Sequence, residues 1–293
     1  MSRMDVDSPL NAGELQLLWL ELTSQCNLTC VHCYAESGPG KLTPDALTTE
    51  EYIGIIDSAA SLGCRDIQFI GGEPTLFRDL NRLIAHTRSV GCGVEVYTNA
   101  LSIPADLLAC FIEHRVDIAT SFYCDVPTIH DQITQRKNSH AMTVRTIRHL
   151  VEAGLNLRVS IISMELNQAH IETTRDFLLG LGVTRVRVDR ARAFGRASAL
   201  VPFEIEDPIS ELCGYCWNGR LCVSPEGIVW PCTMSRAWPV GSLRHQTLSE
   251  ILQSPKLASV RQQIYSAHFV KDAKCVDAKP AGIGPRGPGR YDG

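Results

Sequence analysis

The sequence predicts an α/β protein in which a (βα)6 unit precedes a small, cysteine-rich C-terminal domain. From residue 15 to about residue 190, short apolar runs alternate with amphipathic stretches, which is the pattern of a parallel sheet covered by helices. This alternation stops after Gly195, and five of the twelve cysteines fall between residues 208 and 275. The chain of 293 residues is 44% hydrophobic, so it can bury a large core.

Six apolar runs define the expected strands, and the amphipathic stretches between them are the expected helices. The first helix has a clear start, because Thr48 can cap it and Glu50 and Glu51 make its first turn acidic. The predicted strands are Leu15–Leu22, Asp66–Ile70, Gly93–Tyr97, Asp117–Ser121, Leu157–Ser163 and Arg185–Asp189, and the predicted helices are residues 49–62, 77–90, 104–114, 142–153 and 170–181.

We divide the chain into four segments by composition. Residues 1–14 are an N-terminal extension, residues 15–207 are the (βα)6 core, and residues 208–275 form the cysteine-rich domain. That domain has too little apolar sequence for a core of its own, so we expect bound ligands to hold it together. Residues 276–293 are rich in Pro and Gly, and we expect a disordered tail.

The net charge, the absence of targeting signals and the number of cysteines limit the partners of the protein and the roles of its cysteines. The net charge of -4 argues against nucleic acid as a partner. The polar segment from Met1 to Gly13 is no signal peptide, and Leu15–Leu22 is too short to cross a bilayer, so we expect a cytoplasmic protein without a membrane partner. In that reducing compartment, twelve cysteines are better explained as metal ligands or reactive thiols than as disulfides.

Three cysteines directly after the first predicted strand form the strongest motif. Cys26, Cys30 and Cys33 supply soft thiolates, which suit an iron–sulfur cluster, and three ligands leave the fourth iron open. A structural zinc site is the alternative. Zinc in a closed site takes four protein ligands, and no further cysteine or histidine follows at zinc-finger spacing.

This C-x3-C-x2-C spacing, with the aromatic neighbours His32 and Tyr34, resembles the signature of the radical S-adenosylmethionine (SAM) superfamily. The resemblance implies a partial (βα)6 TIM-like barrel and a [4Fe-4S] cluster whose open iron binds SAM. It also implies reductive cleavage of SAM to a 5′-deoxyadenosyl radical, which removes a carbon-bound hydrogen from the substrate. A flavodoxin- or ferredoxin-type partner would supply the electron.

The resemblance extends to residues that would bind SAM at the carboxyl ends of the strands, where parallel-sheet proteins bind their ligands. The segment Gly71–Pro74 resembles the family's GGEP motif, in which the backbone and Glu73 hold the SAM ammonium. Ser160 and Arg192 could equally be ordinary polar residues at strand ends. The full set of candidates is Tyr34, Gly71, Gly72, Glu73, Pro74, Thr98, Asn99, Ser160 and Arg192.

A second cysteine group resembles the auxiliary-cluster domain known as SPASM or, in its shortened form, twitch. Cys216, Cys222, Cys232 and the distant Cys275 suffice for one auxiliary [4Fe-4S] cluster with no open iron, and Cys213 is a spare or alternative ligand. A second auxiliary cluster would need more cysteines, so we expect the twitch form. Four cysteines would also suit zinc, and iron content distinguishes the two.

The remaining cysteines and acids offer other candidates. Cys64, Cys92 and Cys110 are expected to be buried apolar residues, whereas Cys124 follows the fourth strand and could face the substrate. Acidic residues near strand ends could together form a pocket for amines, although each could instead cap a helix or pair with a basic residue. These acids are Glu21, Glu36, Asp125, Asp131 and Asp189.

The predicted reaction is radical epimerisation of an aminoglycoside sugar in antibiotic biosynthesis, of the type that converts neomycin C into neomycin B. The compact chain with one auxiliary cluster is similar to such epimerases, and the substrate would be a polycationic small molecule. Epimerisation requires a thiol that returns a hydrogen atom, but Ser249 stands where that donor is expected. Either Ser249 replaces an active-site cysteine, or Cys124 or Cys213 is the donor, or the reaction differs.

Two other functions stay open. The alternative enzyme is a maturase of ribosomal peptides that forms a crosslink, a thioether or a D-residue; no separate leader-binding domain is expected before Leu15, which counts against it. The non-enzymatic alternative is an iron–sulfur scaffold or redox sensor, which the intact Gly71–Pro74 segment disfavours.

Overall fold

The computed structural model describes residues 15–200 and 207–270. One nine-stranded sheet runs through both predicted domains in the order β6-β5-β4-β3-β2-β1-β7-β8-β9. Its first six strands in chain order are parallel, so the predicted (βα)6 unit is confirmed. They are β1 Leu17–Glu21, β2 Asp66–Ile70, β3 Gly93–Tyr97, β4 Asp117–Phe122, β5 Leu157–Ser163 and β6 Arg185–Arg190.

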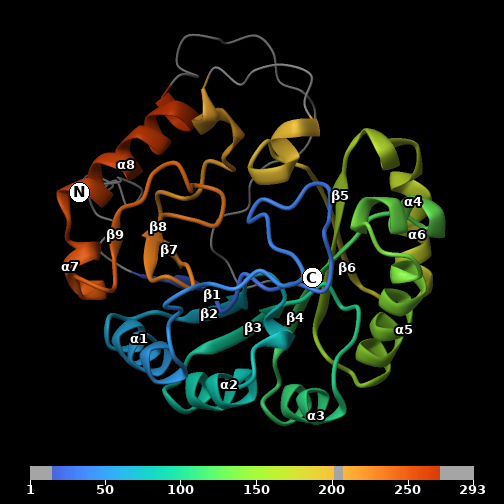
Figure 1. Cartoon of the computed structure of the whole chain (residues 1–293), viewed down its shortest axis with the longest axis horizontal. Coiled ribbons are helices and arrows are strands. Elements are labelled where there is room, and N and C mark those ends of the chain that lie inside the picture. Colours follow the sequence, from blue (N-terminus) through green and yellow to red (C-terminus); the bar gives the residue numbers. More distant parts are fainter. Residues whose placement is uncertain (1–14, 201–206, 271–293) are drawn as a thin grey trace, which may run out of the picture.

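Helices cover the outside of this curved sheet (Figure 1). The side chains of Leu18, Leu20 and Phe69 are fully buried. Other positions of the strands carry polar side chains. One example is the Arg158 guanidinium of β5, which donates to both carboxylate oxygens of Glu95 of β3 at 2.6 and 2.7 Å. The helices are α1 Thr49–Ser61, α2 Leu80–Ser89, α3 Ala105–Glu113, α4 Pro127–Thr134, α5 Ser139–Glu152 and α6 Ile171–Gly180, with 3-10 turns at Pro74–Leu76, Glu165–His170, Gly195–Leu200 and Pro208–Glu211.

Helix α4 and the early start of α5 were not predicted. Gln135 and Asn138 adopt positive φ values of 58° and 66°, which end α4 and begin α5 without the glycine that usually signals such a break. Asp131 then accepts hydrogen bonds from the backbone N–H groups of Asn138 (2.5 Å) and His140 (2.9 Å). Asp131 is therefore a helix-capping residue.

The cysteine-rich segment extends the main sheet (Figure 1). Strand β7 (Arg220–Val223) pairs in parallel with β1, so the segment is attached to the core by a strand ladder as well as by any ligands. The segment then forms a hairpin, because β7 pairs antiparallel with β8 (Ile228–Trp230). The segment continues with β9 Gly241–Ser242, α7 Leu248–Leu252, α8 Pro255–Tyr265 and a π-helical turn at Ser266–Val270.

Three predictions concern residues outside the described ranges. These are the N-terminal extension (1–14), the disordered tail (276–293) and the auxiliary ligand Cys275. Within the described ranges, no helix is both long and apolar enough to cross a membrane.

Candidate active site

The first cysteine group lies in the loop that follows β1. The backbone N–H of Cys33 donates to the Cys30 carbonyl at 3.2 Å, which folds the loop into a tight turn. The Cys26 sulfur accepts from the Leu28 N–H at 3.4 Å and from Asn99 Nδ2 at 3.7 Å. The loop therefore gathers the thiols next to the end of β3.

The three thiols suit an iron–sulfur cluster. Burial, with a smaller contribution from the neighbouring cysteines, raises the pKa of Cys26 to about 11 and that of Cys30 to about 12. Such closely spaced, buried thiols are stable as thiolates only beside compensating positive charge, which iron supplies. The geometry thus brings Cys26, Cys30 and Cys33 together as the sequence predicts.

Gly71 and Gly72 pack directly against the chain that leads into this loop. A Cβ atom on Gly72 would lie 2.1 Å from the Gln25 carbonyl oxygen, and one on Gly71 would lie 2.7 Å from the Thr23 oxygen. Gly71 also has a φ of 141°, which side-chain-bearing residues rarely adopt. Backbone hydrogen bonds from Gly72 to Thr23 (2.6 Å) and from Glu73 to Gln25 (2.9 Å) close the contact.

Glu73 organises the site from within, since its side chain is buried and its two oxygens accept four hydrogen bonds. Thr75 donates through its N–H (3.1 Å) and hydroxyl (2.7 Å), the Thr98 hydroxyl donates at 2.7 Å, and the Asn99 N–H donates at 2.7 Å. Burial raises the pKa of the Glu73 carboxyl, while these hydrogen bonds favour its ionised form. A direct contact between Glu73 and the SAM ammonium stays a prediction.

Asn99 points from this network toward the cysteine loop. Its Nδ2 donates to Asn27 Oδ1 at 2.7 Å, and its Oδ1 accepts from the Leu101 N–H at 2.9 Å. Pro74 is buried at the start of the turn after Glu73. Thr98, Asn99 and the segment Gly71–Pro74 therefore meet beside Cys26, and their role in binding SAM stays a prediction.

Two of the residues predicted to bind SAM, Tyr34 and Ser160, make contacts outside the Glu73 network. The Tyr34 hydroxyl lies 3.5 Å from Glu21 Oε1, and the Arg236 guanidinium lies over the Tyr34 ring. Ser160 pairs in register with Ser121 of β4. A role in SAM binding stays a prediction for both Tyr34 and Ser160.

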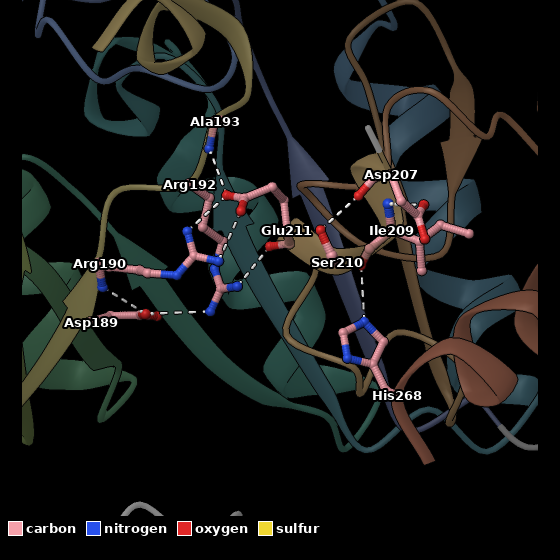
Figure 2. A network of polar contacts seen from close by, with 9 residues as sticks. All are labelled: Asp189, Arg190, Arg192, Ala193, Asp207, Ile209, Ser210, Glu211 and His268. Carbon is pink, nitrogen blue, oxygen red and sulfur yellow. Dashed lines mark hydrogen bonds and ion pairs between the residues drawn. The ribbon is translucent and has the colours of Figure 1, made fainter. Parts of the chain in front are cut away.

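Arg192 belongs to a network that joins the end of β6 to the start of the cysteine-rich segment (Figure 2). It donates to the backbone oxygen of Glu211 at 2.7 Å and to Asp189 at 3.3 Å. The Glu211 carboxylate accepts two hydrogen bonds from Arg190, at 2.8 and 3.0 Å, and one from the Ala193 N–H at 3.0 Å. Arg192 is thus engaged with protein groups, and its contact with SAM stays a prediction.

The second cysteine group is buried around the β7–β8 hairpin. The sulfurs of Cys216 and Cys232 lie 2.7 Å apart, and the side chain of Cys222 is fully buried. Cys213 is exposed and adjoins Cys216, whose hydrogen bond lowers the pKa of Cys213 to about 5. These four cysteines fit a soft metal cluster, and the choice between Cys213 and Cys275 as the fourth ligand stays a prediction.

Cys124 and Ser249 occupy positions that give little support to a role as hydrogen donor. Cys124 is fully buried, accepts from the Val126 N–H at 3.4 Å and contacts Thr174 of α6. Ser249 lies on α7, which packs against α1, and its hydroxyl accepts at 3.3 Å from Nε2 of Gln253, the residue that ends this helix. Within the described residues, the hydrogen bonds of Cys124 and Ser249 are made outside the cysteine loop, although Tyr123, the neighbour of Cys124 in the chain, contacts His32 of that loop.

The acids near the strand ends form separate local contacts, which favours the alternative of helix capping or ion pairing over a shared pocket for amines. Glu21 pairs with Arg236, Asp125 accepts from Thr173 and Thr174, Asp189 pairs with Arg192, Asp131 caps α5, and Glu36 is exposed. The expectation of buried, apolar thiols is confirmed for Cys64 and Cys92, whereas Cys110 is partly exposed.

Three residues near the clusters were missed by the sequence analysis. The Arg196 guanidinium donates to the backbone oxygens of Cys30 (2.8 Å) and Ser37 (2.9 Å), so it fixes the cysteine loop. Tyr123 lies edge-on to His32, with ring centroids 4.9 Å apart. Arg236 follows Cys232 by four residues, and a cation so close to a predicted cluster ligand was a signal that the sequence offered.

The model of the radical SAM superfamily matches residues 20–178, which is more than half of the chain. This chain belongs to the radical SAM superfamily. A second model, the SPASM iron–sulfur cluster-binding domain, matches residues 213–277 of this radical SAM enzyme. Together they support a SAM-binding [4Fe-4S] cluster, SAM, and an auxiliary iron–sulfur cluster as its cofactors.

Similar proteins include two from Bacillus subtilis. The sporulation killing factor maturation protein SkfB is 24% identical over 88% of this chain and 68% of its own length. The subtilosin biosynthesis protein AlbA is 26% identical over 87% of this chain and 64% of its own length. The mycofactocin maturase MftC of Mycobacterium tuberculosis is 30% identical over 62% of this chain. The chain thus spans about two thirds of the first two relatives and 46% of the third.

Solved structures agree on the fold. Streptococcus suis SuiB bound to SAM superposes with a TM-score of 0.68 at 14% identity, covering 85% of this chain and 68% of SuiB. The enzyme anSMEcpe with bound SAM and a peptide gives 0.70 at 15% identity, covering 90% of this chain and 86% of that one. At these identities the likeness supports the partial barrel with its appended domain and nothing about the substrate.

Proposed function

We propose that this radical SAM enzyme modifies a peptide by removing a carbon-bound hydrogen atom. The observation that carries the proposal is the extent of the match with SkfB and AlbA, which covers 88% and 87% of this chain. The match therefore includes the cysteine-rich segment as well as the barrel. SkfB is named for maturation of the sporulation killing factor and AlbA for biosynthesis of the bacteriocin subtilosin.

The residues around the cysteine loop would perform the first half of this reaction. SAM and its cluster, when bound, supply a carbon-centred radical that can break an unactivated C–H bond. Cys26, Cys30 and Cys33 would hold the cluster. The Gly71–Gly72 backbone would approach SAM closely, because no Cβ atom intervenes. Glu73 would position the Thr98–Asn99 strand end beside it.

Epimerisation of an aminoglycoside sugar has less support. That prediction depended on a hydrogen donor at position 249 or on another free thiol. Ser249 lies on α7 next to the outer helix α1, and Cys124 is buried against α6. Cys213 is an exposed thiol, but it adjoins the auxiliary ligands. The relatives named above also point to peptides.

Deuterium transfer tests the choice of substrate. The reduced enzyme would be incubated with SAM and either a mixture of deuterated peptides, obtained by digesting protein from cells grown in heavy water, or deuterated neomycin C. We expect deuterated 5′-deoxyadenosine from the peptides and only unlabelled 5′-deoxyadenosine from neomycin C. Label from neomycin C alone, or from neither probe, would overturn the proposal. Cys26→Ala is the control that should form no 5′-deoxyadenosine.

A further inference from the structure

Arg236 lies between the two cysteine groups. Its guanidinium carbon is 4.9 Å from the ring centroid of Trp230 and 5.3 Å from that of Tyr34. Trp230 is the cross-strand partner of Cys222 in the β7–β8 hairpin, and Tyr34 directly follows Cys33 in the other loop. A positive charge thus lies against two aromatic rings, and each ring adjoins a predicted ligand of a different cluster.

Glu21 holds this charge in place. The Arg236 guanidinium forms an ion pair with the Glu21 carboxylate, which is the last residue of β1 and is 3% exposed. The Arg236 side chain is itself only 27% exposed. Charges that water reaches so poorly act more strongly on their neighbours than surface charges do.

These contacts leave one hydrogen-bond donor of Arg236 without an acceptor. Its Nε is buried and has no hydrogen-bond partner within the described residues. Buried donors without a partner are costly, so a native structure normally supplies an acceptor. The sulfur atoms of a cluster held by Cys222 and Cys232 would be suitable acceptors, because Cys222 pairs across the hairpin with Trp230, whose ring the Arg236 guanidinium contacts.

We propose that Arg236, oriented by Glu21, stabilises the reduced state of the auxiliary cluster and thereby raises its reduction potential. Reduction adds one electron from the external donor and no proton, so the cluster gains one negative charge that the guanidinium offsets. Net charge and hydrogen bonds to sulfur are established determinants of such potentials. The inference rests on the auxiliary cluster and is independent of the identity of the substrate.

Redox titration of the holoenzyme tests this role. Dithionite would reduce the protein stepwise while electron paramagnetic resonance follows each cluster, and added SAM distinguishes them because it alters only the signal of the cluster with the open iron. Arg236→Met should shift the auxiliary potential to more negative values, since a positive charge is lost. Glu21→Gln keeps a side-chain oxygen that accepts from the Arg236 guanidinium, so it should shift the potential to more positive values, since only a negative charge is lost. Arg236→Lys, which keeps the charge, should stay near the wild type.

Shifts of opposite sign would not follow from a merely structural role. A common direction for Arg236→Met and Glu21→Gln, or no shift in either variant, would overturn the proposal. If Arg236→Met loads too little iron to titrate, Glu21→Gln decides alone, and a positive shift is then required. Failure of the peptide experiment would leave these potentials unaffected, so the two proposals fail separately.

Discussion

Replacing Gly72 with alanine should disrupt the cysteine loop without touching any cysteine. The new Cβ atom would lie 2.1 Å from the Gln25 carbonyl oxygen and 2.6 Å from its carbon. Non-bonded heavy atoms prefer a separation of about 3.5 Å. The obstacle is backbone rather than a flexible side chain, so the segment that leads into Cys26 must move.

The magnitude follows from the hydrogen bonds that this movement breaks. The bonds from Gly72 to Thr23 and from Glu73 to Gln25, at 2.6 and 2.9 Å, span the same contact. A buried hydrogen bond contributes about 1 kcal/mol, and an orphaned buried partner costs about 1–3 kcal/mol. We therefore expect Gly72→Ala to lose about 2–4 kcal/mol of unfolding free energy and to bind less iron at the first cluster.

Anaerobic urea denaturation and iron analysis of the reconstituted protein measure both effects. Gly54→Ala is the matched control, because Gly54 lies within α1 and a Cβ atom there would meet nothing within 4 Å. Alanine is the better helix former, so the control should gain about 0.5–1 kcal/mol. Wild-type stability together with full iron loading in Gly72→Ala would refute the close-approach argument.

Three further predictions concern the clusters and a buried histidine. Cys26→Ala should abolish 5′-deoxyadenosine formation and reduce the iron content from about eight to about four atoms per chain, as expected for two [4Fe-4S] clusters; retained cleavage would contradict the first assignment. If Cys275 is the fourth auxiliary ligand, Cys275→Ala should lower the auxiliary iron content and Cys213→Ala should not, and the reverse result would assign Cys213. Burial lowers the pKa of His130 to about 3, so the unfolded chain takes up its proton first, and stability present above pH 6.5 is lost as the pH falls toward 3. This loss is about 2 kcal/mol between pH 8 and pH 5, and urea denaturation of His130→Asn should show it reduced by that amount.

Much of the fold could be predicted because the parallel core has a strong local signal. The strands Asp66–Ile70, Gly93–Tyr97 and Leu157–Ser163 have the predicted bounds, since each is an apolar or alternating run between helix signals. Helix α4 was missed because Gln135 and Asn138 make its breaks without glycine. The parallel pairing of β7 with β1 joins residues some 200 positions apart, and no local pattern reports such a contact.

The residues of the candidate site also fall into those that the sequence predicted and those whose contacts only the tertiary structure shows. The spacing of Cys26, Cys30 and Cys33 and the resemblance of the segment Gly71–Pro74 to a family motif predicted these residues from the sequence, because a cluster and its cosubstrate need several ligands close together on one loop or strand end. Only the tertiary structure shows the contacts of the isolated polar residues. Glu73 accepts hydrogen bonds from Thr98 and Asn99, and Arg236 forms an ion pair with Glu21. Those contacts cross between elements, so their chemistry depends on a register and a burial that exist only once the sheet has formed.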